Sequence, residues 1–471
     1  MSASSAANTI YACTTPPGRG GVAVVRVSGP AAQNSLAALC PALPGKGRGE
    51  SAGKAEGNSG EEEKKETAPP SHKLTLCKII NPDTGALIDH GMAVFFKGPA
   101  SYTGDDTVEY HTHGSPAVIT ALLETLNKQP HHRMAEPGEF TRRAFENDKM
   151  DLTAAEAVAD LIHAETEAQR LQALSQMGGA LATLYDGWRE NLARALAYLE
   201  ADIDFPDEDL PDGVMEQTRP ILEKLHTEID NHLNDNRRGE ILRDGVHVAV
   251  IGAPNAGKSS LVNALAQREV AIVSDIAGTT RDIIETHLNL GGYPVIISDT
   301  AGLRPEQLGN SDHDKIESEG IRRALARAHA ADIKILLFDA TAQTIDTHTQ
   351  ALMDEHSITV LNKIDQKKSN MPDALSVSVK TETGLDDVTN ALVEKIKNII
   401  GTRNIPSPTR ARHRSALEEC KESIIRALKA PQAELIAEDV RLSMRALGRI
   451  TGRVDVEDLL DIIFRDFCIG K

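Results

Sequence analysis

Residues 246–260 read VHVAVIGAPNAGKSS, and this stretch decides the fold of the middle of the chain. Val246–Ile251 is a short apolar run of the kind that forms a buried parallel strand. It leads into Gly252-Ala-Pro-Asn-Ala-Gly-Lys-Ser259, the pattern G-x-x-x-x-G-K-S, and then into the helical pattern Ser260–Ala266. In this pattern backbone N–H groups surround the phosphates, the lysine contacts the β- and γ-phosphate oxygens, and the serine hydroxyl binds Mg²⁺. The stretch therefore predicts a phosphate-binding loop in a parallel-sheet α/β domain.

The segments expected to face the γ-phosphate follow this loop. Gly278–Asp282 (GTTRD) lies where the first switch of a GTPase belongs, and Thr280 is placed to complete the Mg²⁺ shell. The predicted strand Pro294–Ser298 runs into Asp299-Thr-Ala-Gly302, whose carboxylate can hold the water shell of the metal. Ras-like enzymes orient the attacking water with a Gln directly after this motif. Here that position is Leu303, so another group must position the water.

The motifs expected to bind the base follow two further predicted strands, 333–338 and 358–361. The second strand ends in Asn362-Lys-Ile-Asp365, and a carboxylate there can accept both N–H groups on one edge of guanine, a pair that adenine lacks. Ser378-Val-Lys380 suits a loop that closes over the base. Four motifs in this order predict GTP as the ligand. The residues expected around GTP are Asn255, Ala256, Gly257, Lys258, Ser259, Ser260, Thr279, Thr280, Asp299, Gly302, Asn362, Lys363, Asp365, Ser378, Val379 and Lys380, with Ser259 and Thr280 as Mg²⁺ ligands.

The rest of the chain divides around this α/β domain. Short β-type runs at 22–27, 74–80 and 92–96, followed by a helical pattern at 117–126, predict an α+β domain over residues 1–149. Within it, residues 44–70 are rich in Gly, Ser, Pro and charge, which predicts a mobile insertion, with a binding tail as the alternative.

Helical patterning over residues 150–241 and 402–471 predicts one helical domain that the GTPase domain, residues 242–401, interrupts. Thr153 and Glu156 fit a capping box at the start of its first helix.

The composition excludes several classes of protein. The chain has 471 residues, a formal net charge of −18 and 40% apolar residues, which suits several globular domains. No apolar run is long enough to span a bilayer and the first residues lack the features of an export signal, so a cytoplasmic protein without a membrane role is expected. Five scattered cysteines argue against a disulfide framework or a zinc site. The acidic total excludes nucleic-acid binding by bulk charge, and the locally basic stretch Arg403–Arg414 is either a solvated helix start or a tRNA-phosphate contact.

Taken together, these motifs resemble one family, the tRNA uridine-modification GTPases called MnmE or TrmE. GAPNAGKSS, GTTRD, DTAGLR and NKID resemble the GTPase domain of that family. Outside it, the stretches that resemble family signatures are Thr15–Gly29 (TPPGRGGVAVVRVSG), Ser101–Tyr110 (SYTGDDTVEY), Pro137–Leu152 (PGEFTRRAFENDKMDL) and Cys468–Lys471 (CIGK). The resemblance covers residues 8–471 apart from 44–70. It implies an N-terminal α+β folate-binding domain, a discontinuous helical domain and an inserted Ras-like P-loop GTPase domain.

The resemblance implies that the N-terminal domain forms a homodimer and binds a folate of the 5-formyltetrahydrofolate type, as one-carbon donor or its analogue. The positions that match the folate contacts of the family are Arg26, Glu109, Lys149 and Lys471. Glu109 can pair with the N–H edge of the pterin, and the three cations can offset the glutamyl carboxylates.

The resemblance also implies the reaction. Family members act with a flavoprotein partner, MnmG, which carries the FAD, and a heterotetramer is expected. Together they add an aminomethyl or carboxymethylaminomethyl group to C5 of the wobble uridine in certain tRNAs. Cys468 is a candidate nucleophile toward the uracil ring, with a small buried apolar side chain as the alternative.

For GTP hydrolysis the resemblance implies a K⁺ ion in place of an arginine finger. Asn255 is the expected side-chain ligand, and the backbone carbonyls of Ser274, Ile276 and Thr279 complete the shell when two GTPase domains meet. Glu317 is the expected catalytic acid, acting on the attacking water through a second water, with a surface charge as the alternative. Asp282, in the first switch, is a further candidate catalytic residue.

The chain departs from the family pattern at two places. Ser115 replaces the second Gly of the usual His-Gly-Gly, and the segment after Arg304 is longer than the second switch of the family. His111 and His113 lack a third nearby ligand, so packed or surface histidines are favoured over a metal pair.

Two other functions compete with this prediction. An RNA- or ribosome-assembly GTPase would carry an added basic domain or a second GTPase domain, and neither is present in the sequence. A folate-dependent methyltransferase with a regulatory GTPase would leave the wobble uridine of tRNA unaffected when the protein is removed.

Overall fold

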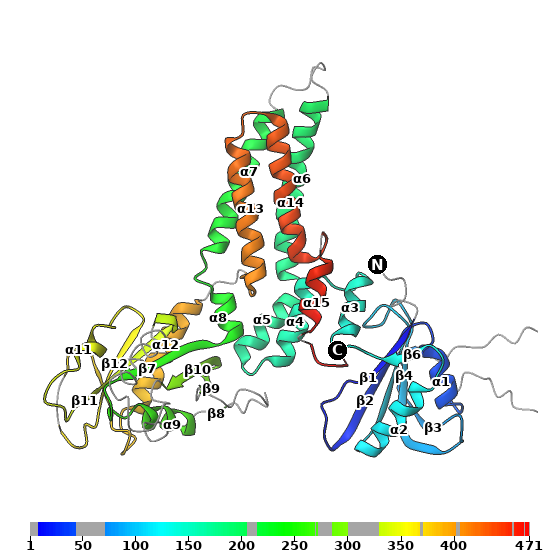
Figure 1. Ribbon diagram of the computed structural model, residues 1–471, viewed down its shortest axis with the longest axis horizontal. Helices are drawn as coiled ribbons and strands as arrows, with labels where there is room; N and C mark the ends of the chain where they lie inside the picture. Colours follow the sequence, from blue (N-terminus) through cyan, green and yellow to red (C-terminus); the bar gives the residue numbers. More distant parts are fainter. Residues whose placement is uncertain are drawn as a thin grey trace, which may run out of the picture. The chain divides into compact units, whose positions relative to one another are not determined.

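The computed structural model describes residues 8–43, 71–204, 214–268, 270–271, 285–299, 329–367, 371–401, 406–454, 456–465 and 467–470. The predicted insertion at 44–70 lies outside these residues. The chain separates into two units, one made of residues 1–156 and 452–471 and the other of residues 157–451. Figure 1 shows their elements in chain order. No helix of the described residues is long and apolar enough to cross a membrane.

The first unit contains a six-stranded sheet with the strand order β3-β4-β5-β2-β1-β6. All neighbouring strands are antiparallel except β1 and β6. Residues that alternate along the strands, such as Val25, Val27 and Tyr110, are buried together with Leu36 and Leu122 of helices α1 and α2. This confirms the predicted α+β class. The elements are β1 (Thr9–Cys13), β2 (Gly20–Ser28), α1 (Ala32–Leu39), β3 (Thr75–Ile80), β4 (Leu87–Phe96), β5 (Thr107–Gly114), α2 (Pro116–Asn127), β6 (His132–Met134) and α3 (Glu139–Glu146).

The last described residues of the chain pack within this first unit. Helix α15 (Glu457–Arg465) lies against α3, where Arg142 Nη1 donates to Asp461 Oδ1 at 2.8 Å. Gly138, at φ +68°, lies so close to α15 that a Cβ there would be 2.6 Å from the carbonyl oxygen of Phe464. The sequence pattern groups residues 402–471 with the helical domain, whereas the structure places residues 452–471 with the first unit.

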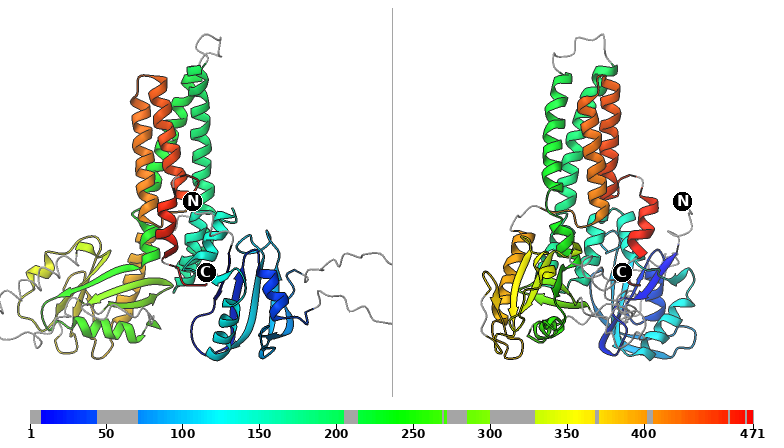
Figure 2. Two further views of the ribbon diagram at one scale, coloured as in Figure 1. Left: turned by 45° about the vertical axis from the view of Figure 1, so that its right-hand side comes forward. Right: turned by 60° about the vertical axis from the view of Figure 1, so that its left-hand side comes forward.

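The second unit is built on four long helices that pack side by side, as Figure 2 shows. Leu192, Leu225, Leu417 and Leu447, one from each helix, belong to its buried core. The four are α6 (Ala180–Asp204), α7 (Val214–Leu233), α13 (Ala411–Lys429) and α14 (Ala433–Thr451). Helix α4 (Leu152–His163) leads into the unit, and α5 (Glu167–Met177) and α8 (Arg238–Asp244) are shorter. The helical patterning of the sequence is therefore confirmed on both sides of the α/β block.

The start of α4 corrects the predicted capping box. The carboxylate of Asp151 accepts from the backbone N–H of Ala154 at 2.8 Å and from the hydroxyl of Thr153. Thr153 therefore lies inside the first turn, and Asp151 takes the capping role that the pattern had given to Thr153. A complete capping box instead begins α5, where Thr166 and Gln169 exchange side-chain and backbone hydrogen bonds.

The α/β block contains a seven-stranded sheet with the order β13-β12-β11-β7-β10-β9-β8. Strands β10, β7, β11, β12 and β13 are parallel to one another, and β9 pairs antiparallel with both β10 and β8. The strands predicted at 246–251, 294–298, 333–338 and 358–361 are all present in this block. The elements are β7 (Val246–Gly252), α9 (Lys258–Arg268), β8 (Val270–Ala271), β9 (Glu285–Leu290), β10 (Tyr293–Asp299), β11 (Ile333–Asp339), α11 (Thr347–Gln350), β12 (Ser357–Asn362), β13 (Leu375–Ser376) and α12 (Leu385–Ile400).

The two ends of this block meet where it joins the helices, at a place that we call the neck (residues 235–243 and 407–414). Gly239 of α8 lies so close to Pro408 that a Cβ would collide with the Pro408 carbonyl oxygen. Arg243 Nη1 donates to the carbonyl oxygen of Thr409 at 3.0 Å. Arg414 donates to the carboxylates of Asp235 at 2.8 Å and Glu240 at 3.1 Å. Charge-assisted hydrogen bonds therefore fasten the start of the block to its end.

Candidate functional site: a nucleotide pocket

The sheet topology brings the predicted motifs to one edge. Because β7, β10, β11 and β12 run parallel, their last residues Gly252, Asp299, Asp339 and Asn362 all lie at the carboxyl edge of the sheet. Ligands of open α/β sheets bind at this edge. The fold thus brings three motifs that are far apart in the sequence, together with Asp339, into one site.

The phosphate-binding loop has a backbone that few residues tolerate. Gly257 has φ +99°, and a Cβ there would collide with the side-chain nitrogen of Asn362. Asn255 also has a positive φ of +64°, a conformation that Asn adopts more readily than most residues. Lys258 Nζ donates to the carbonyl oxygens of Gly252 at 2.8 Å and Ala253 at 3.0 Å. The lysine therefore curls back over its own loop, toward the place that the motif assigns to phosphate.

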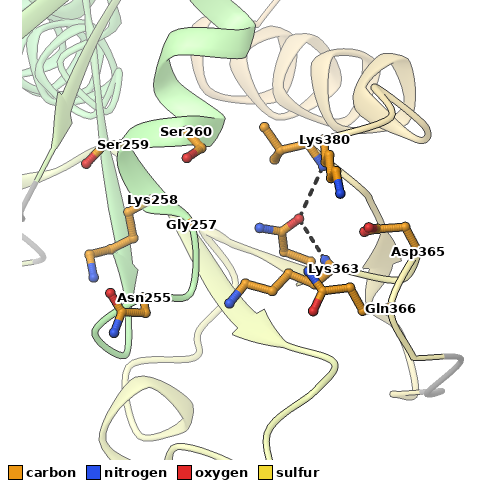
Figure 3. A pocket seen from close by; sticks show the side chains of 11 residues that line it. Asn255, Gly257, Lys258, Ser259, Ser260, Lys363, Asp365, Gln366 and Lys380 are labelled. Atoms are coloured by element: carbon orange, nitrogen blue, oxygen red, sulfur yellow. Dashed lines mark hydrogen bonds between the residues drawn. The ribbon is translucent and has the colours of Figure 1, made fainter.

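The buried side chain of Asn362 joins the loop to the base-binding motifs. Its Nδ2 donates to the carbonyl oxygen of Ala256 at 2.8 Å. Its Oδ1 accepts from the backbone N–H groups of Lys363 at 2.8 Å and Val379 at 3.3 Å, the two dashed lines in Figure 3. One amide thus connects three segments of the site.

The base side of the site is organised around Asp365. Its Oδ1 accepts from the hydroxyl of the fully buried Ser378 at 2.7 Å, which fixes the orientation of the carboxylate. Lys363 Nζ forms an ion pair with Asp339 Oδ2 at 2.7 Å. Partial burial opposes ionisation of Asp339, but hydrogen bonds from Lys363 and Thr341 outweigh it and lower the pKa of this carboxyl group. The carboxylate of Asp365 and the ammonium of Lys363 are therefore each held in place by a neighbouring side chain.

These groups surround a pocket of about 500 Å³, within the usual range for small-molecule sites. Its lining residues are Asn255, Gly257, Lys258, Ser259, Ser260, Asn362, Lys363, Asp365, Gln366, Val379 and Lys380. All of them except Gln366 were predicted. Two other predicted residues bond to the lining residues: the carbonyl oxygen of Ala256 accepts from Asn362, and the hydroxyl of Ser378 donates to Asp365. Gln366 and Asp339 were missed, although Gln366 directly follows the NKID motif and Asp339 directly follows the predicted strand 333–338.

The remaining predicted residues of this site cannot be placed. Thr279, Thr280, Gly302, Ser274, Ile276, Asp282 and Glu317 lie outside the described residues, and of Asp299 only the backbone at the end of β10 is described.

The predicted folate residues lie in the first unit, and two of them contact each other. Arg26 Nε donates to Glu109 Oε1 at 2.9 Å from the neighbouring strand, and the Arg26 guanidinium lies 5.1 Å from the ring centre of Tyr102. The other Glu109 oxygen is 3.5 Å from His111 Nε2. Lys149 is exposed, and its Nζ donates to the carbonyl oxygen of Pro99 at 2.8 Å. Lys471 lies outside the described residues.

Cys468 and the histidines can also be compared with the predictions. Cys468 is exposed, which contradicts the alternative of a buried apolar side chain. His113 Nδ1 contacts Asp89 at 2.8 Å. Burial opposes ionisation of Asp89, but hydrogen bonds from His113 and His90 lower its pKa. Among the described residues no group of His, Cys, Asp and Glu could hold a metal ion.

Comparison with known proteins gives matches along nearly the whole chain. The family model described as the MnmE helical domain matches residues 152–468, and that of the GTP-binding protein TrmE N-terminus matches residues 9–149. The tRNA modification GTPase MnmE of Parvibaculum lavamentivorans is 52% identical over 467 residues, which cover 98% of this chain and 100% of the relative. The protein of the same name from Rhodospirillum rubrum is 48% identical over 472 residues, 98% of this chain and 99% of the relative. A solved structure, the G domain of the T. maritima FeoB iron transporter, matches 33% of this chain and 99% of that chain at 25% identity, with a TM-score of 0.23.

Proposed function

The chain belongs to the MnmE family of tRNA modification GTPases, and we propose that it hydrolyses GTP in the course of tRNA modification. The observation that carries this proposal is the full-length family match, joined to a pocket in which the phosphate-binding loop faces the NKID motif. Under this proposal residues 1–149, joined by residues 452–471, serve folate binding and dimerisation. The helices of residues 150–241 and 402–451 are the scaffold, and residues 242–401 hydrolyse GTP.

GTP is proposed to lie across the pocket, with its phosphates at residues 252–259 and its base at Asp365. Lys258 now donates to two neutral carbonyl oxygens, and anionic phosphate oxygens accept stronger hydrogen bonds, so the ammonium is expected to exchange partners. Ser259 would hold Mg²⁺ together with Thr280. Its hydroxyl lines the pocket, and such hard oxygen donors are what Mg²⁺ prefers. Mg²⁺, when bound, neutralises charge between the β- and γ-phosphates.

K⁺ is proposed to supply the positive charge that an arginine finger gives in other GTPases. Asn255 lines the pocket beside the phosphate-binding loop, and its amide oxygen is a suitable ligand for a hard cation. Ser274, Ile276 and Thr279 would contribute carbonyl oxygens, and Glu317 and Asp282 would act on the attacking water in place of the glutamine that Leu303 replaces.

Steady-state hydrolysis in K⁺ and in Na⁺ at saturating GTP tests this role of K⁺. Turnover should be markedly higher in K⁺, and Asn255→Ala should remove the difference while retaining GTP binding. Equal turnover in the two salts for the unmodified chain would reject K⁺ activation. The assignment of the chain as a GTPase would still hold.

The first unit is proposed to bind the folate. Glu109 is placed to pair with the pterin, and the geometry gives Arg26 a second task, because its guanidinium donates to Glu109 Oε1 at 2.9 Å and orients that carboxylate. Lys149 and Lys471 would then offset the glutamyl carboxylates. Cys468, being exposed, is accessible for the proposed attack on the uracil ring.

The complete reaction is proposed to join this chain, as a homodimer, with an MnmG-like flavoprotein that carries the FAD. Together they would add an aminomethyl or carboxymethylaminomethyl group to C5 of the wobble uridine of certain tRNAs. Nucleoside analysis of tRNA from cells that lack the protein tests this. Deletion of the gene should leave C5 of the wobble uridine unmodified. The wild-type gene should restore the modification, and a gene that carries Lys258→Ala should not. Normal tRNA in the deleted strain would reject the proposal.

A further inference from the structure

A half-buried ion pair lies at the edge of the nucleotide pocket, and one of its two partners lines the pocket. Asp339 ends β11 and Asn362 ends β12, and the two residues are directly opposite in the parallel pairing of these strands. Lys363, the next residue, extends its Nζ to Asp339 Oδ2 at 2.7 Å. Lys363 and its neighbours Asp365 and Gln366 line the pocket, whereas Asp339 does not.

The carboxylate of Asp339 is held in a single orientation. Its Oδ1 accepts from the backbone N–H of Thr341 at 2.8 Å and from the hydroxyl of Thr341 at 2.7 Å, which leaves Oδ2 for the ammonium. The turn that carries it is fixed to the neighbouring strand, because the Ala340 N–H donates to the carbonyl oxygen of Asn362 at 2.9 Å. The side chains of Asp339 and Lys363 are only 18% and 26% exposed, so solvent screens this pair less than a surface salt bridge.

Lys363 is constrained along its whole length. Its backbone has φ +68°, an uncommon conformation for lysine, and its N–H donates to the side chain of Asn362. Its carbonyl oxygen accepts from the N–H of Gln366 at 3.0 Å. With the ammonium held by Asp339, both ends of the side chain are fixed, and Figure 3 shows its four-carbon stem extended along one side of the pocket. A free lysine would sample many rotamers there, and ordering them would cost binding free energy.

We propose that Asp339 is a positioning residue for base binding: it fixes the ammonium of Lys363 so that the lysine stem forms a preorganised wall against which the guanine ring lies. Lysine buries its stem on apolar surfaces while its charge keeps a polar partner, and a planar base held at its edge by Asp365 needs such a surface beside its face. This inference rests on the proposed function, because it assigns a group to the base side of the same GTP site.

Titration calorimetry with the full-length chain tests the proposal. Asp339→Asn keeps the volume and the acceptor for Thr341 but removes the charge, and it should weaken the affinities for GDP and GTP by the same factor, about tenfold. The affinity for inorganic tripolyphosphate should not change, because this probe has no base. Unchanged GDP affinity, or an equal loss for tripolyphosphate, overturns the proposal.

A double-mutant cycle separates positioning from general damage to the fold. Lys363→Met keeps the hydrocarbon stem without the ammonium, and adding Asp339→Asn to it should cause no further loss of GDP affinity. Additive losses would mean that Asp339 acts independently of Lys363, and they overturn the proposal.

The matched control lies at the other end of the same strand. Lys334 of β11 pairs with Asp354 far from the pocket lining, and Asp354→Asn should leave GDP affinity unchanged. A loss as large as that of Asp339→Asn would show that any broken ion pair on β11 weakens binding, which overturns the proposal. Failure of the proposed GTPase function would give a different result, because the unmodified chain would then bind ADP as tightly as GDP.

Discussion

At the scale of single residues, Asn362 illustrates how one buried polar group can organise a site by bonding to the segments that line it. Its amide nitrogen and oxygen are both used, by Ala256 on one side and by Lys363 and Val379 on the other. Leaving a buried hydrogen-bonding group without its partner costs about 1–3 kcal/mol. The shape of the phosphate-binding loop and that of the base-binding loop are therefore coupled energetically through one side chain.

The proposed role of Asp365 gives the first prediction. Asp365→Asn should shift the preference of the protein from GTP towards xanthosine triphosphate, because the amide offers a donor where the carboxylate offered an acceptor. Its remaining oxygen can still accept from Ser378, so the loop should keep its shape. Competition titrations with a fluorescent GTP analogue measure the shift. Equal GTP affinity in the variant would show that Asp365 does not contact the base.

His232 in the helical bundle gives a prediction about pH. Burial is the main cause that lowers its pKa to about 4; Asp235 opposes this effect, and Arg238, Arg414 and His413 add to it. Because the folded protein holds this histidine neutral and the unfolded chain has an ordinary pKa of about 6.5, its contribution is complete above about pH 6.5 and is lost as the pH falls towards 4. The loss amounts to at most about 3 kcal/mol of unfolding free energy.

The chain contains its own probe for this effect. Trp188, the only tryptophan, has its ring centre 5.3 Å from that of His232. Urea unfolding followed by tryptophan fluorescence should show a midpoint that falls between pH 6.5 and 4, and His232→Gln should flatten that dependence. A midpoint that falls equally in the variant would place the titration at other groups.

At the scale of elements, the helix starts show what a local pattern can and cannot determine. Thr153 with Glu156 and Thr166 with Gln169 both have the spacing of a capping box, yet only the second pair forms one. The difference is Asp151, which takes the capping role at α4 through hydrogen bonds to Ala154 and Thr153. Two acceptors compete for the same free N–H groups, and the spacing alone does not say which of them wins.

The capping box of α5 gives a prediction at this scale. Thr166→Ala removes the acceptor for the Gln169 N–H and should lower the stability of the second unit by about 1 kcal/mol. Thr166→Ser keeps the hydroxyl and should recover most of this loss. Thermal unfolding followed by circular dichroism measures both midpoints. Equal midpoints for the Ala and Ser variants would assign the effect to the lost methyl group and not to the cap.

At the scale of the whole molecule, the separation into two units predicts independent activities. Arg26→Ala should weaken folate binding about tenfold, because the Glu109 carboxylate loses its ionic partner, while GTP turnover stays unchanged. Arg142→Ala, which breaks an exposed ion pair of the same unit, is the matched control and should change neither. Parallel loss of folate binding and GTP turnover in Arg26→Ala would contradict the proposed division of labour.

Local patterns predict the GTPase fold far better than the packing between distant segments. The strand, loop and helix around Lys258 are contiguous, so their geometry follows from the local sequence. In β5, by contrast, Glu109, His111 and His113 alternate with buried residues in a polar run that the sequence did not mark as a strand. The position of α15 could not be predicted either, because its buried Phe464 indicates that one face is covered without saying that α3 and Gly138 cover it.

The neck has a consequence for how such a chain can arise. Since Gly239 touches Pro408 and Arg243 bonds to Thr409, the α/β block leaves the helices and returns to them at a single point. A module whose two ends meet can be inserted into, or excised from, a host at one loop without separating the parts of the host. A short linker from residue 237 to residue 410 would close the gap, and the bundle of α6, α7, α13 and α14 would keep its core. The molecule thus has the geometry of an insertion, in which a nucleotide-binding module is joined to a helical scaffold at one junction.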